Sequence, residues 1–169
     1  MHFSRFLLFS IFVFATLLLP PLALSDFIGP VVSVLDGDTI EVLHNGKADR
    51  IRLSGIDCPE KGQAHSTNAK QAASTLVFGK QITLRTYGLD KCGRTIADVF
   101  LPDGTNVNHT LVKAGWCWWY RKYAPGDTEL ERLEKEARES RRGLWADPNL
   151  FDRDVLRATG LRQDDRSSR

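Results

Sequence analysis

Two turn dipeptides near the start of the chain constrain its fold more than any other feature. Asp36-Gly37 lies between two runs rich in β-branched and aliphatic residues, 28–35 and 39–43. Asn45-Gly46 separates the second run from a third, 49–56. Both dipeptides favour hairpins because their residues adopt positive φ at low cost. The pattern therefore predicts a three-stranded antiparallel meander.

Helical spacing and two more strands follow the meander. Helices are expected over 66–78, 107–114 and 128–143, and strands over 81–87 and 95–101. Ser66-Thr67-Asn68 offers an N-cap for the first helix. Thr128 is expected to cap the third while Glu131 reaches back. Five short strands with a helix between the third and fourth match the order of an OB-fold barrel. We predict a mainly β, α+β fold, a five-stranded OB-fold barrel with three helices; an unclosed α+β sheet is the alternative.

The first 25 residues have the pattern of an export signal. Arg5 precedes an apolar stretch from Phe6 to Leu19, and small residues at 23 and 25 suit a signal peptidase, so cleavage is predicted after Ser25. We expect a secreted or periplasmic protein with no stable membrane association; uncleaved, this segment would serve as an N-terminal anchor. The domain is predicted over 26–146, followed by a flexible polar tail, 147–169.

Charge and cysteine content limit the class of protein. The chain has 23 Lys and Arg against 21 Asp and Glu, a net charge of +2. A dedicated DNA-binding protein usually has a large excess of positive charge, which this chain lacks. A nucleic-acid partner would therefore have to bind a local positively charged patch. Cys58, Cys92 and Cys117 in an exported chain permit one disulfide, and spacing does not choose among the three pairs.

Charged residues at strand ends and turns suit the hydrolysis of a phosphodiester. The carboxylates are Asp36, Asp38, Asp57 and Glu60, and the cations are Arg52 and Arg94. Each alone also fits an ordinary turn, strand end or solvated loop. Together, two guanidinium groups can clamp phosphate oxygens, and Asp carboxylates with a backbone carbonyl form a hard oxygen site for calcium. Glu60 is left to orient or deprotonate water.

Four motifs occur in order along the chain. They are Val34-Leu35-Asp36-Gly37-Asp38-Thr39, Arg52-Leu53-x-x-Ile56-Asp57-x-Pro59-Glu60, Asp90-Lys91-x-Gly93-Arg94 and Val107-Asn108-x-x-Leu111-Val112-x-x-Gly115. With them, the stretch from about Pro30 to Trp145 strongly resembles the staphylococcal nuclease (thermonuclease) family. Each motif alone is weak, whereas the four in series are highly specific.

The resemblance implies a monomeric, calcium-dependent endonuclease on an OB-fold barrel. Calcium would be held by Asp38, Asp57 and the backbone carbonyl of Cys58. Arg52 and Arg94 would contact the scissile phosphate, and Glu60 would be the general base. The implied substrates are DNA and RNA, preferably unpaired. Cleavage of the bond to the 5′ oxygen would leave 3′-phosphate ends.

Two positions depart from the family pattern on the substrate side. Cys92 stands where the family often has a tyrosine, and Arg121 where one of two base-stacking tyrosines is expected; Tyr123 matches the other. We expect Lys91, Arg121 and Tyr123 to bind substrate, since a planar guanidinium also stacks on bases. The neighbouring aromatics, Trp116, Trp118, Trp119 and Tyr120, are expected to pack mostly in the core.

Two readings without catalysis compete with this one. A binding module could hold single strands in an OB-fold groove, but such a module is expected to lose the arginine and carboxylate set, which this sequence keeps. A calcium-stabilised structural domain would account for the carboxylates and leave Arg52 and Arg94 unexplained.

Overall fold

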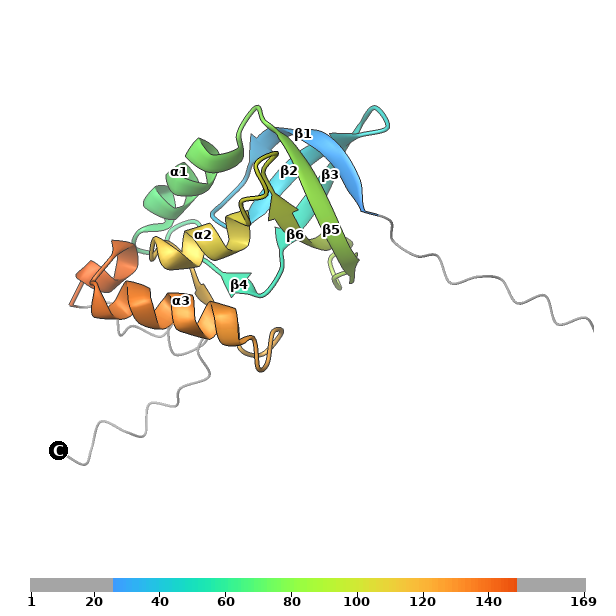
Figure 1. Ribbon diagram of the computed structural model, residues 1–169. Coiled ribbons are helices and arrows are strands. Elements are labelled where there is room, and N and C mark those ends of the chain that lie inside the picture. The colour runs from blue at the N-terminus through green and yellow to red at the C-terminus, as the bar shows by residue number, and fades with distance from the viewer. Residues whose placement is uncertain (1–25, 149–169) are drawn as a thin grey trace, which may run out of the picture.

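The computed structural model describes residues 26–148 (Figure 1). Its strands are β1 (Phe27–Val34), β2 (Thr39–His44), β3 (Lys47–Leu53), β4 (Ile56–Asp57), β5 (Gln81–Leu89), β6 (Thr95–Phe100) and β7 (Trp118–Trp119). Its helices are α1 (Ser66–Val77), α2 (Val107–Lys113), α3 (Thr128–Glu139) and a 3-10 helix over Gly143–Ala146. Five strands close into a barrel in the order β1-β2-β3-β6-β5, and β4 pairs with β7. The predicted α+β barrel is confirmed, and the open sheet is excluded.

The barrel's interior and one flanking layer of helices form one continuous core. Alternate residues of the strands point inward, and the most deeply buried include Val42, Ile51, Leu84 and Val99. Figure 1 shows the three helices gathered on one side of the barrel, with β4 extending from the barrel toward them. On α3, buried Leu130, Leu133 and Ala137 repeat at helical spacing, as the sequence pattern predicts.

Glycine is required for different reasons at the two predicted hairpin turns. At Asn45-Gly46 both residues have positive φ, 50° and 77°, and β2 pairs with β3 in the expected register. Gly37 does not adopt a positive φ. A Cβ atom on Gly37 would instead lie 2.8 Å from the Cβ of Cys58, so this glycine permits close packing between two segments.

The third predicted strand, 49–56, is two strands, so that prediction is wrong. β3 ends at Leu53, and Gly55 with φ 70° turns the chain out of the barrel. The two residues of β4 then pair antiparallel with β7, Ile56 opposite Trp119 and Asp57 opposite Trp118. A two-residue strand that leaves the barrel has no periodicity to mark it. Its effect is to carry Asp57 away from the barrel surface toward the helices.

Two helices start where predicted but have other N-caps than expected. Asp127, not Thr128, is the N-cap of α3, and its side chain accepts from the backbone N of Glu129 and Leu130. A carboxylate at this position also interacts favourably with the helix dipole. α1 starts at Ser66 after His65, which caps it without a side-chain hydrogen bond. α3 ends at Glu139, earlier than predicted.

Predictions for the two ends fall largely outside the described residues. The expected signal segment, 1–25, lies outside them, as does the expected tail from residue 149 onward. Asp147, the first residue of the predicted tail, is described, and its Oδ2 lies 2.9 Å from His65 Nε2. Over residues 26–148, every helix is too short or too polar to cross a bilayer.

Candidate active site

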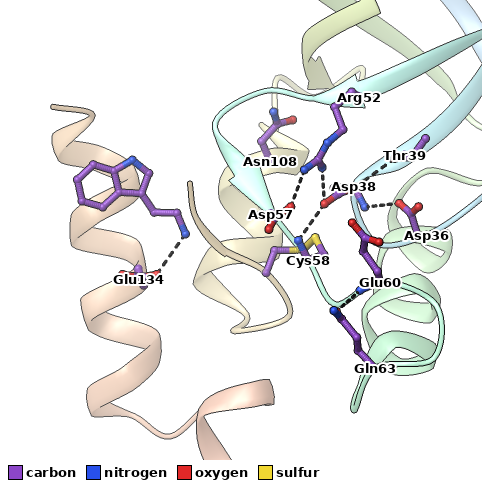
Figure 2. Close-up of a disulfide and its surroundings, with 12 residues drawn as sticks. Asp36, Asp38, Thr39, Arg52, Asp57, Cys58, Glu60, Gln63, Asn108 and Glu134 are labelled. Atoms are coloured by element: carbon purple, nitrogen blue, oxygen red, sulfur yellow. Dashed lines mark hydrogen bonds and ion pairs between the residues drawn. A yellow bond between two sulfur atoms is a disulfide. The ribbon is translucent and has the colours of Figure 1, made fainter. Parts of the chain in front are cut away.

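Arg52 joins two of the carboxylates that the sequence places at strand ends. Its Nη1 forms an ion pair with Asp38, and its Nη2 donates to Asp57 Oδ1 at 2.7 Å (Figure 2). Ile51 and Leu53 on either side point into the core, so Arg52 faces the opposite way, as its parity in the strand predicts. One guanidinium group thus holds together carboxylates that lie on separate segments of the chain.

Asp38 is the most deeply buried acidic group of this cluster, only 6 % exposed. Its Oδ2 accepts from the backbone N of Cys58 at 2.8 Å, and its Oδ1 from the hydroxyl of Thr39 at 3.1 Å. Burial raises the pKa of Asp38 to about 7, since the attraction of Arg52 only partly offsets desolvation and the repulsion of Asp36 and Asp57. Burial alone would lower the pKa of Arg52, but Asp38 and Asp57 outweigh it and raise that pKa.

The high pKa of Asp38 predicts how pH affects the metal-free protein. The folded pKa exceeds the ordinary value of 3.8, so the folded state binds the proton more tightly than the unfolded chain. Its contribution to stability is therefore full below pH 3.8 and is lost as pH rises toward 7. In EDTA, the melting temperature of the wild type should fall across this window relative to Asp38→Asn, which cannot titrate. A difference that stays constant with pH would contradict the assignment.

Arg94 approaches the same cluster from the loop between β5 and β6. Asp90 Oδ2 accepts from Arg94 Nε at 2.7 Å, while its Oδ1 accepts from the backbone N of Cys92 and of Arg94. Burial would raise the pKa of Asp90, but these hydrogen bonds outweigh it and lower the pKa. Arg94 Nη1 lies 3.5 Å from Thr39 Oγ1, and Thr39 in turn donates to Asp38. The second guanidinium group is therefore one side chain away from the first cluster.

A cleft of about 480 Å³ opens beside these groups. All predicted site residues except Asp38 and Arg121 line this cleft. The predicted residues that line it are Arg52, Asp57, Cys58, Glu60, Lys91, Arg94 and Tyr123. Glu60 is exposed at the cleft, and its backbone N donates to Gln63 Oε1 at 2.6 Å. Tyr123 is 67 % exposed, whereas Trp118 and Trp119 are buried, as predicted.

Arg121 is held away from the lining of the cleft. Its Nη2 forms an ion pair with Glu134 Oε2 at 2.8 Å, and its guanidinium lies over the Trp119 ring, 4.3 Å from the centroid. Glu134 is 2 % exposed and also accepts from the backbone N of Trp119. Arg121 therefore balances a buried carboxylate and supports β7, with its guanidinium group lying over the Trp119 ring.

Three residues that the sequence analysis names without a role at the site contribute to it. Asp90 positions Arg94, Thr39 connects Arg94 to Asp38, and Cys117 forms a disulfide with Cys58. The spacing of four between Asp90 and Arg94 was a signal that could have revealed the first. The other two connections depend on contacts between distant segments.

The donor set has the chemistry that a hard divalent cation prefers, although the described residues form no preformed cage. Within residues 26–148, no cluster of three or more His, Cys, Asp or Glu side chains is arranged as a metal site. Asp38 and Asp57 nevertheless share one guanidinium group, and burial raises the pKa of Asp38 because its carboxylate has lost most of its water. Carboxylate oxygens with a neighbouring backbone carbonyl fit an oxygen-binding cation, which would stabilise the buried negative charge.

The fold and the site together define a class of protein. Two guanidinium groups converge on a carboxylate cluster in one cleft at the surface of a small barrel. Arginine forks bind phosphate oxygens bidentately, and a nearby exposed carboxylate can activate water. This combination is suited to phosphodiester hydrolysis.

Comparison with known proteins gives the family. Residues 50–147 match the family described as staphylococcal nuclease homologue. An uncharacterized endonuclease of Escherichia coli O157:H7 is 46% identical over 127 residues, covering 75% of this chain and 82% of that protein. A micrococcal nuclease of Shigella flexneri is 43% identical over 136 residues, covering 75% and 78%. A staphylococcal-like nuclease, CAN1, of Arabidopsis thaliana is 38% identical over 103 residues, 61% of this chain and 31% of that protein.

The chain therefore belongs to the staphylococcal nuclease homologue family. It is an endonuclease, a phosphodiester hydrolase whose substrate is nucleic acid. The non-catalytic binding module and the purely structural domain are excluded as accounts of its function.

Proposed function

We propose that this endonuclease is exported, depends on calcium, and cleaves both DNA and RNA with a preference for unpaired strands. The observation that carries the proposal is the Arg52 fork, which gathers Asp38 and Asp57 beside the cleft that Arg94 and Glu60 line. Because one chain supplies all of these groups, the protein is proposed to act as a monomer.

Each residue of the site has a proposed task. Asp38, Asp57 and the backbone carbonyl of Cys58 would hold calcium, which when bound would neutralise charge on the phosphate. Arg52 and Arg94 bind the non-bridging oxygens of the scissile phosphate, where negative charge grows during attack. Glu60 orients a water molecule and accepts its proton.

The remaining cleft residues are proposed to bind the substrate strand. Lys91 supplies a positive charge for a neighbouring phosphate, and Tyr123 presents an exposed ring on which a base can stack. An accessible base occurs in unpaired strands, which accounts for the proposed preference. Arg121 is left out of this set because Glu134 holds its guanidinium on Trp119.

Attack by water on phosphorus is proposed to break the bond to the 5′ oxygen. The products would then be a 3′-phosphate on one fragment and a 5′-hydroxyl on the other. Export is supported by the pattern of the first 25 residues and by the Cys58–Cys117 disulfide, since such bonds persist in oxidising compartments.

A calcium-switched digestion tests the proposal. Purified protein is incubated with denatured DNA, duplex DNA and RNA, in millimolar calcium or in EDTA, and the fragment ends are tested for removable 3′-phosphates. We expect cleavage only with calcium, fastest on the unpaired substrates, and fragments with 3′-phosphates. Equal degradation in EDTA, or 5′-phosphate ends, would contradict the proposed chemistry.

A further inference from the structure

A disulfide lies at the edge of the active site. It joins Cys58, the residue after Asp57, to Cys117, the residue before β7. Both cysteines are buried, 3 % and 0 % exposed. The backbone N of Cys58 donates to Asp38 Oδ2 at 2.8 Å, so Cys58 touches one carboxylate of the Arg52 fork and adjoins the other in sequence (Figure 2).

The disulfide secures a segment that has left the barrel. After β3 the chain forms only the two-residue strand β4, whose partner is the equally short β7. β7 is in turn fixed to the helical layer, because the backbone N of Trp119 donates to Glu134 Oε1. The bridge therefore ties the segment that carries Asp57 covalently to Cys117, next to β7, and β7 is in turn hydrogen-bonded to α3.

The same disulfide packs against the turn that carries Asp36 and Asp38. A Cβ atom on Gly37 would lie 2.8 Å from Cys58 Cβ and 3.0 Å from its Sγ. Close packing without a side chain at Gly37 brings the two carboxylate-bearing segments together at the bridge. A change in the position of Cys58 would consequently be transmitted to both Asp38 and Asp57.

We propose that the Cys58–Cys117 disulfide is a positioning element of the active site and that nuclease activity depends on its oxidation. The inference rests on the proposed function, because it concerns the geometry of the proposed cation ligands. Without the bridge, only the two-residue β4–β7 ladder and side-chain packing hold this segment, so it opens more easily. Groups that orient metal ligands typically change affinity or activity 10–100-fold when they are lost.

The redox step is an ordinary thiol–disulfide exchange. The thiolate of an external dithiol attacks one sulfur of the bridge and forms a mixed disulfide; its second thiolate then releases the cysteine. Two cysteine thiols are formed and the dithiol becomes a disulfide. A small-molecule disulfide reverses the reaction. A chain held in a reducing cytosol would therefore be weakly active, and export would activate it.

The test compares bridged and unbridged protein in a Cys92→Ala background, which removes the free thiol. The bridged protein, the same protein reduced with dithiothreitol, and the Cys58→Ala/Cys117→Ala variant are measured for calcium affinity by calorimetry and for kcat and KM on single-stranded DNA. Both unbridged forms should bind calcium about tenfold or more weakly and have a lower kcat. Reoxidation of the reduced protein should restore both values.

A remote core variant separates positioning from general stability. Leu84→Ala, in the bridged protein, removes a fully buried side chain of β5 and destabilises the fold away from the cleft. We expect it to keep wild-type calcium affinity at temperatures where circular dichroism shows it folded. Folded, unbridged protein with unchanged calcium affinity and kcat would overturn the inference.

Two further outcomes are unfolding of the unbridged protein and inactivity of the bridged protein. If the unbridged protein unfolds, it is refolded in trimethylamine oxide, which favours the compact state, and remeasured. Full calcium affinity and activity in the refolded, unbridged protein would overturn the inference, whereas persistently weak calcium binding would support it. If the bridged protein itself shows no calcium-dependent cleavage, the proposed function is contradicted, and this inference with it.

Discussion

Replacing Arg94 with alanine is expected to lower kcat on single-stranded DNA by about three orders of magnitude. The side chain lines the cleft, and Asp90 fixes its Nε, so the guanidinium is oriented before the substrate arrives. Its loss removes positive charge from the position where the phosphate gains negative charge. The fold should be retained, because a loop ion pair that is partly exposed contributes little to stability.

Two controls sharpen this result. Arg50→Ala removes the same charge from the outside of the barrel, where Arg50 is 56% exposed and pairs with Glu41, and it should leave kcat unchanged. Arg94→Lys keeps the charge but not the fork, so its kcat should fall between those of the wild type and Arg94→Ala. Wild-type turnover by Arg94→Ala would show that the phosphate lies elsewhere.

Glu60→Gln is expected to lower kcat by about two to four orders of magnitude, the usual contribution of a general base. The amide has nearly the same shape but cannot accept a proton from water. Local structure should persist, because the turn is closed by the backbone N of Glu60 and the side chain of Gln63, not by the Glu60 carboxylate. Steady-state kinetics in saturating calcium, with circular dichroism as a check on folding, measures the effect.

Calcium affinity distinguishes a base from a metal ligand at this position. If Glu60 acts on water, Glu60→Gln should bind calcium almost as the wild type does. Recovery of full kcat at high calcium would instead make Glu60 a ligand and would remove it from the chemistry. Glu131→Gln, an exposed residue on α3, is the matched control and should change neither quantity.

The barrel could be predicted because its signals are local. Asn45-Gly46 specifies a hairpin through its own backbone conformation, and the spacing of Leu130, Leu133 and Ala137 specifies one buried face of a helix. The split between β3 and β4 had one local signal, the turn dipeptide Ser54-Gly55, but the apolar residues on both sides of it favour one continuous strand. What makes β4 a strand is its pairing with Trp118 and Trp119, far along the chain.

Only part of the site could be predicted from the sequence. The orientation of Arg52 could be predicted, because in a strand it points to the opposite side from Ile51 and Leu53. The structure confirms this orientation, since Ile51 and Leu53 are buried in the core. Its partners Asp38 and Asp57, the raised pKa of Asp38 and the choice of Cys117 for Cys58 all depend on how distant segments pack. The ion pair of Arg121 depends on such packing too. Glu134 reads as one of many charges on α3, yet its burial draws the guanidinium to it.

We propose that one cation and two guanidinium groups act on a single phosphate. A crystal structure of the protein with calcium and a short DNA strand whose central linkage resists cleavage tests this arrangement. We expect calcium about 2.3–2.6 Å from oxygens of Asp38, Asp57 and the Cys58 carbonyl, with one phosphate touching the ion, Arg52 and Arg94 together. Calcium bound outside the Asp38–Asp57 pair, or Arg52 and Arg94 on different phosphates, would contradict the account.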